Sequence, residues 1–169
     1  MTTSLMDNAF GHHVWATLRV LDECLALSPE QLETAVPGTY GSILDTARHT
    51  VDADASYLFV LSGGRVSLID ESAMDLAELR ATVEGHGAEW SSVLGEDPDP
   101  DSVLVRHRED GSSTGAPVSI RLAQALHHGT DHRSQICTAL TTLGKEPPLI
   151  DVWDYGFETG SVTDTPPTS

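Results

Sequence analysis

Two histidines, His128 and His132, lie four residues apart, and this spacing suits metal chemistry. Apolar residues around them recur at helical intervals, and side chains four apart in a helix stand one turn above each other, with Cβ atoms roughly 5–6 Å apart. That separation lets two imidazoles bind one metal ion. Gly129 follows His128, so the glutamate of an HExxH zinc-protease motif is missing. The pair therefore indicates metal binding without naming a reaction, unless the two histidines are incidental neighbours.

Gly129 is itself unusual, because a glycine inside a helix costs about 1 kcal/mol relative to alanine. It lies directly after the first histidine of the pair. Either a close approach of another helix or room for a ligand would explain it.

A third ligand must come from elsewhere in the chain. The other histidines are His12, His13, His49, His86, His107 and His127. His86 and His107 lie in the least regular segments and are the weakest candidates. His127 is turned about 100° from His128 on the same helix, which places it at the rim. Spacing alone does not choose among the remainder.

His49 lies in the middle of a predicted helix, on the face opposite its apolar stripe. Asp45, Asp52 and Ser56 share that polar face. The pattern by itself favours exposure to solvent. The alternative is a polar pocket in which Asp45 or Asp52 holds the second imidazole nitrogen. Both interpretations stay open on the residues alone.

Four long helices are predicted, and one of them carries the histidine pair. They span about residues 8–27, 42–61, 73–94 and 119–143. Apolar residues recur in each at steps of three and four, which is typical of an amphipathic helix. Ser42 and Asp45 approximate a capping box at the start of the second helix, and Ser119 is the expected N-cap of the fourth. The sequence therefore predicts an all-α fold, a four-helix bundle.

Residues 95–118 interrupt this helical pattern. Short apolar stretches at 103–105 and 117–118 flank a glycine-containing turn, which is typical of two paired strands. A small β-hairpin is therefore expected between the third and fourth helices.

The C-terminal part of the chain changes character after residue 149. Its aromatic residues are expected to pack back on the helices, whereas residues 159–169 are rich in Thr, Pro and Ser and are expected to be disordered. We therefore expect one domain, residues 1–158, followed by a disordered tail, residues 159–169.

The composition excludes several classes of partner. The formal charge is −17, from 26 acidic and 9 basic residues. A nucleic-acid binder needs clustered basic residues to neutralise phosphates, and an anionic membrane surface would repel this acidic chain.

Cys24 and Cys137 are far apart and belong to no CxxC pair, so buried, reduced thiols are expected. No signal peptide is recognised, and the densest apolar run, residues 57–61, is too short to span a bilayer. A cytoplasmic location is expected.

Five segments occur in an order and spacing that carry a family resemblance. They are HVWA at 13–16, VPGTYGSI at 36–43, RHTVDAD at 48–54, HGTDHRSQ at 128–135 and the stretch from 144 to 156. In this combination the chain resembles the DinB/YfiT-like family of helical metalloproteins, which is unrelated to the DNA polymerase of similar name. Many relatives have glycine in place of Ser134, a departure that does not touch the metal ligands.

The resemblance implies a four-helix bundle that holds one divalent ion, nickel or zinc, with His49, His128 and His132. Three protein ligands leave at least one coordination position open, as in catalytic zinc sites. Relatives include S-transferases that use low-molecular-weight thiols such as bacillithiol and mycothiol. We therefore expect a metal-dependent thiol S-transferase, or a related lyase or hydrolase, acting on a small molecule. The alternative is a non-enzymatic metal-binding stress-response protein.

Other residues receive roles from the same expectation. Arg133 would be a catalytic residue that steers an anionic thiol or substrate, and its alternative is a surface cation. Trp15, Tyr57 and Trp153 would wall the pocket for the thiol cofactor, and their alternative is plain core packing. Two copies of the chain could also assemble as a homodimer through helix faces.

Overall fold

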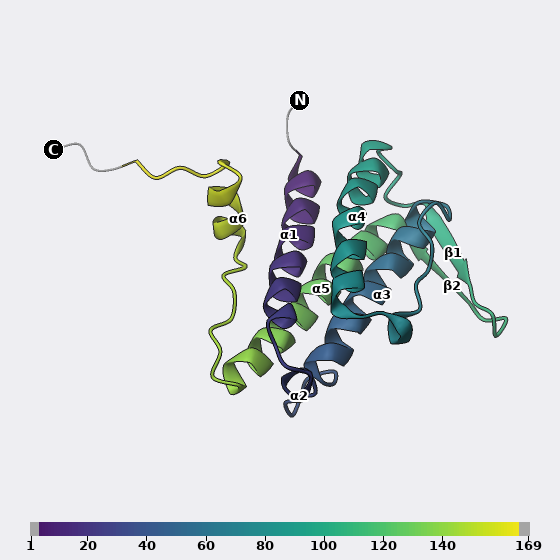
Figure 1. Cartoon of the computed structure of the whole chain (residues 1–169). Coiled ribbons are helices and arrows are strands. Elements are labelled where there is room, and N and C mark those ends of the chain that lie inside the picture. Colours follow the sequence, from purple (N-terminus) through teal and green to yellow (C-terminus); the bar gives the residue numbers. More distant parts are fainter. Residues whose placement is uncertain (1–3, 166–169) are drawn as a thin grey trace.

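Four long helices pack side by side in the computed structural model, which describes residues 4–165 (Figure 1). They are α1 (Leu5–Leu25), α3 (Ile43–Leu61), α4 (Leu76–Gly95) and α5 (Val118–Thr142). Their main contacts run from α1 to α4, from α4 to α3, from α3 to α5 and from α5 back to α1. Each long helix therefore has two neighbours, and the mostly helical fold predicted from the sequence is confirmed.

Shorter elements complete the described part of the chain. They are α2 (Pro29–Leu32), the 3-10 helix η1 (Glu71–Ala73), β1 (Val103–His107), β2 (Ser113–Pro117) and α6 (Val152–Glu158). The two strands pair antiparallel, from Val103 opposite Pro117 to His107 opposite Ser113. They form the expected hairpin between the third and fourth long helices, and it contacts α3 and α5 (Figure 1).

The start of α3 agrees with the sequence, whereas the start of α5 differs. Ser42 caps α3, and its hydroxyl accepts the Asp45 N–H at 3.1 Å. The prediction that Ser119 caps α5 is wrong, because Pro117 takes the N-cap position and no side chain caps this helix. The strand runs directly into the helix. Its first N–H groups instead donate to the carbonyls of Ser102 and Pro100 at 2.9 and 3.0 Å.

The other two long helices differ from prediction by a few residues at their first turn. Helix α1 begins at Leu5, because Ser4 forms a capping box with Asp7. Helix α4 begins at Leu76, because Asp75 caps it and the preceding residues 71–73 form the separate turn η1. In both cases a local side-chain cap, rather than the apolar repeat, sets where the helix starts.

The predicted tail, residues 159–169, lies partly outside the described residues, which end at 165. Within them, the N–H groups of Ser161 and Val162 donate to the Gly156 carbonyl at 2.8 and 2.9 Å. The chain therefore folds back on α6 just after this helix ends.

Two apolar clusters fill the interior, one toward each end of the long helices. The first contains Val20, Leu21, Cys24, Ile43, Ala47, Val51, Leu76, Leu79, Val83, Ile136, Ala139 and Leu140. The second contains Phe10, Leu58, Trp90, Val93, Val118, Leu122 and Ala125. The thiol of Cys24 is free and buried, as predicted, and burial raises its pKa to about 12. Cys137 is free and half-buried.

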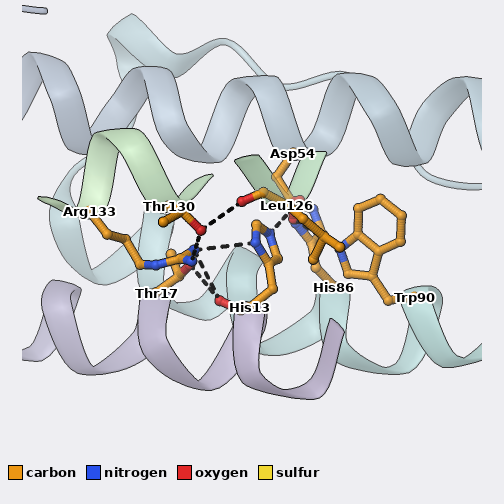
Figure 2. Close-up of polar contacts among 8 residues, drawn as sticks. All are labelled: His13, Thr17, Asp54, His86, Trp90, Leu126, Thr130 and Arg133. Carbon is orange, nitrogen blue, oxygen red and sulfur yellow. Dashed lines mark hydrogen bonds and ion pairs between the residues drawn. The ribbon is translucent and has the colours of Figure 1, made fainter. Parts of the chain in front are cut away.

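A buried polar network lies between these clusters, and Asp54 of α3 is at its centre (Figure 2). The Asp54 carboxylate accepts hydrogen bonds from His13 Nε2 at 3.0 Å, His86 Nδ1 at 2.7 Å and Trp90 Nε1 at 3.2 Å. Asp54 is only 6% exposed. Three donors thus replace the water that an ionised carboxylate loses on burial.

Arg133 of α5 supplies the opposite charge of the network (Figure 2). Its guanidinium is buried and donates to His13 Nδ1 at 3.2 Å, to Thr17 Oγ1 at 3.0 Å and to Thr130 Oγ1 at 3.1 Å. Because a guanidinium only donates, His13 Nδ1 must accept and the ring proton must be on Nε2, facing Asp54. The His13 imidazole therefore bridges a buried cation and a buried anion, and the network includes residues from all four long helices.

Gly129 of α5 is the point where the network touches the histidine pair. A Cβ atom there would lie 2.5 Å from His13 Cε1 and 2.8 Å from Arg133 Nη1. No side chain larger than hydrogen fits without moving both groups. Of the two explanations for this glycine, close approach of another helix is therefore the correct one.

We predict that Asp54→Asn lowers the free energy of unfolding by about 3–5 kcal/mol at pH 7, because it leaves Arg133 without its buried counter-charge. Burial raises the pKa of Asp54, but its interactions with His13 and His86, hydrogen bonds among them, outweigh burial and hold the pKa far below its usual range. A carboxylate with a depressed folded-state pKa stabilises the protein above its unfolded pKa of about 3.9, and this stability is lost as pH falls below it.

Urea unfolding at pH 7 and pH 3 measures both effects, and the difference between wild type and Asp54→Asn should shrink at the lower pH. The matched control is Asp22→Asn, because Asp22 pairs with Arg80 on the surface. Exposed pairs contribute about 0–1 kcal/mol. Equal losses in the two variants would contradict a special role for Asp54.

Candidate metal centre

Three histidine side chains converge between α3 and α5. The Nε2 atom of His128 lies 3.1 Å from Nε2 of His49 and 3.2 Å from Nε2 of His132. Nitrogen ligands lie about 2.1 Å from a zinc ion, so two of them at angles of about 95–110° are about 3.1–3.4 Å apart. The three residues are a group that could hold one metal ion.

The two helices bring these side chains together in different ways. His128 and His132 follow each other at one-turn spacing on α5, as the sequence predicted. His49 comes from α3, which packs against α5. The polar face of α3 that carries His49 therefore faces a neighbouring helix at this point. Among residues 4–165 no hydrogen bond joins His49 to Asp45 or Asp52, so a role of either carboxylate in holding the imidazole stays a prediction.

Tyr40 and Gln135 support the three rings, and neither was singled out from the sequence. The Tyr40 ring stacks on His49, with centroids 4.1 Å apart and an interplanar angle of 7°. Gln135 Oε1 accepts the Tyr40 backbone N–H at 2.8 Å and lies 3.3 Å from His132 Nδ1. This places the His132 proton on Nδ1 and leaves the Nε2 lone pair for a metal ion. The signal in the sequence was the three-residue step from His132 to Gln135, which shares a helix face.

The electrostatics of the three imidazoles favour their neutral, ligating form. Burial lowers the pKa of His128 to about 4, and the nearby His132 and His49 add to this effect. Burial also lowers the pKa of His49 and of His132. Neutral imidazole is the form that binds metal, so protons compete weakly at neutral pH.

A pocket of about 390 Å³ adjoins the histidines. His49 and His128 line it together with Tyr57, whose ring meets His128 edge-on at 6.1 Å. Asp52 also lines the pocket, whereas Asp45 bonds to Ser42 at the start of α3. Tyr57 thus lies where the pocket wall was expected.

The remaining predicted site residues lie elsewhere. Trp15 is half-buried between α1 and α6 and donates to Glu158, and Trp153 is 67% exposed on α6. Neither is among the residues that line the pocket. Arg133 is buried in the polar network, so its position gives no support to a role in steering an anionic ligand, which stays a prediction.

His86 is the residue whose environment was predicted least well from the sequence. It was ranked among the weakest candidates because Gly85 and Gly87 flank it in the predicted helix, but α4 continues through both glycines and buries His86 against Asp54. Tertiary contacts around α4 outweigh the low helix propensity of the two glycines.

One protein-family model matches almost the whole chain. The model described as DinB family matches residues 1–165. The chain belongs to the DinB family. A search of curated proteins finds no match. Among residues 4–165 of this DinB-family protein, no helix is both long enough and apolar enough to cross a membrane.

We predict that Gln135→Leu weakens metal binding by about 10–100-fold, the usual cost of losing the partner that orients a ligating histidine. Gln135→Glu is the matched control, because it keeps an acceptor oxygen in place and should retain the affinity. Competition with a metal-binding dye measures both constants. An equal loss in the two variants would mean that Gln135 acts only by packing.

Proposed function

We propose that this DinB-family protein binds one divalent ion, nickel or zinc, through His49, His128 and His132. We propose further that the protein is a metal-dependent thiol S-transferase, or a related lyase or hydrolase, acting on a small molecule. The observation that carries the proposal is the convergence of three imidazoles, two of which, His49 and His128, line a pocket large enough for a small ligand. Three protein ligands leave coordination open, which is the arrangement of catalytic metal sites.

The fold itself supports the proposal. The contacts of α1, α3, α4 and α5 follow a closed ring, which favours a four-helix bundle, and metal sites in such bundles are built from side chains on facing helices. The three histidines come from two facing helices of that ring.

Within the site, the residues of this chain would hold the metal ion and orient its ligands and the substrate. A bound ion would lower the pKa of a thiol or water in the open position. Gln135 fixes the orientation of His132, and Tyr57 forms a wall of the pocket. In the proposed transfer, the thiol sulfur bonds to an electrophilic carbon, the leaving group departs with its electron pair, and the thiol proton passes to solvent.

Metal analysis tests the first half of the proposal. We expect one nickel or zinc ion per chain, and an affinity lowered by at least about 100-fold in His49→Ala, His128→Ala or His132→Ala, because a tridentate site loses a ligand. His127→Ala is the matched control, since His127 is an exposed neighbour on the same helix. An absence of stoichiometric metal, or equal binding by the triple variant, would overturn the assignment.

Turnover of a thiol and an electrophile tests the second half of the proposal, the enzymatic activity. The metal-loaded protein is offered bacillithiol or mycothiol with a panel of electrophiles, and thiol consumption and the thioether product are measured. We expect turnover that stops on chelation and returns when metal is added. Stoichiometric metal without turnover across the panel would contradict the enzyme and favour the non-enzymatic metal-binding alternative.

A further inference from the structure

The pocket beside the histidines gathers positive charge in an otherwise acidic protein. Arg106, Arg108 and Arg121 all line it, although the whole chain has only 9 lysines and arginines against 26 acids. The same pocket is lined by His49 and His128. A third of the basic residues therefore lie next to the candidate metal centre.

The hairpin and the first turns of α5 bring these three side chains together. Arg106 lies in β1, and Arg108 follows the end of this strand. Arg121 of α5 donates through Nη2 to the carbonyls of Leu104 and Thr114, at 2.8 and 3.0 Å. One guanidinium thus fastens both strands to the helix, so the hairpin holds its arginines at the mouth of the pocket.

The positive charges of these arginines are not balanced by the protein. Arg19, Arg65 and Arg80 each pair with a carboxylate within 4 Å, but within residues 4–165 none of the three pocket arginines does. Among the described residues that line the pocket, Asp52 is the only acid. Three cations therefore face one carboxylate, an arrangement that would attract an anion.

Arg121 is the one buried arginine of the three that line the pocket. Arg121 is only 8% exposed, and its Nε atom is buried without a hydrogen-bond partner in the described structure. A buried N–H of a charged group is costly to leave unbonded, so native proteins almost always satisfy it. Nε itself is covered, so an oxyanion would interact with Arg121 through those atoms of the side chain that line the pocket.

We propose that this pocket is a binding subsite for a small organic anion, whose carboxylate or phosphate group is held by Arg106, Arg108 and Arg121. Guanidinium groups bind both oxyanions through paired, charge-assisted hydrogen bonds. The rest of the anion then lies beside His49 and His128. The idea that this anion is a substrate rests on the function proposed above. The anion subsite itself rests only on the three arginines.

The test uses the metal-free protein, so that binding to a metal ion does not contribute. Succinate and inorganic phosphate are titrated separately, and succinamide, which has the shape of succinate without its charge, is the ligand control. Calorimetry gives the affinity, and NMR follows the Arg121 Nε–H signal. We expect saturable binding of at least one anion, a shift of that signal, weaker binding at high salt and no binding of succinamide.

The double variant Arg106→Gln/Arg108→Gln is the principal test, because both side chains lie on the hairpin and neither fastens it to α5. It should weaken anion binding by at least about tenfold through the loss of two charge-assisted contacts. Arg65→Gln is the matched control, since Arg65 is an exposed arginine paired with Glu96, and it should bind as wild type does. Arg121→Gln, checked for folding by circular dichroism, should abolish binding.

The results separate this proposal from the proposed function. Anion binding without metal binding would support the subsite and overturn the metal centre. Metal binding with no saturable binding of either anion, or with unchanged binding by the double variant, would overturn the subsite and leave the metal centre standing. Tighter binding of succinate than of phosphate would assign the ligand to carboxylates, and the reverse would assign it to phosphates.

Discussion

The buried Asp54 carboxylate is the interaction on which the arrangement of the helices depends. An ionised group in this position must be matched by donors, and the chain supplies them from α1 and α4, while Arg133 of α5 completes the charge balance through His13. Hydrophobic attraction is non-directional, whereas a fully satisfied hydrogen-bond network that joins four helices requires particular positions of its donors and acceptors. The two apolar clusters therefore supply burial, and the network between them fixes the alignment of the helices.

The candidate metal centre lies against this network. Gly129, which His13 and Arg133 cover, lies between the two metal-ligand candidates of α5. On α3, Asp54 follows His49 by little more than one turn. Contacts that align α3 with α5 around Asp54 therefore also set the distances among the three imidazoles. This explains why a site that spans two helices can place Nε2 of His128 within 3.1 Å of His49 Nε2 and 3.2 Å of His132 Nε2.

Charge divides the molecule into two regions of opposite character. Most of the chain is acidic, and its exposed arginines form pairs such as Arg65 with Glu96. The pocket beside His49 and His128 is different, because it collects cations and keeps its imidazoles neutral through burial. Neutral imidazoles favour a metal ion, and the neighbouring guanidinium groups favour an anion. The two proposed kinds of recognition therefore meet in one pocket.

The sequence by itself determined the four long helices, the hairpin and the spacing of His128 and His132, because helical and strand periodicity are local properties. His49 entered through family resemblance, since periodicity shows which face of a helix is polar but not whether that face meets solvent or a neighbour. Only the tertiary structure decided that Gln135 supports the site and that Arg133 is buried away from it. Those outcomes depend on which helices are neighbours and at what register, and neither is encoded in the spacing of residues along one helix.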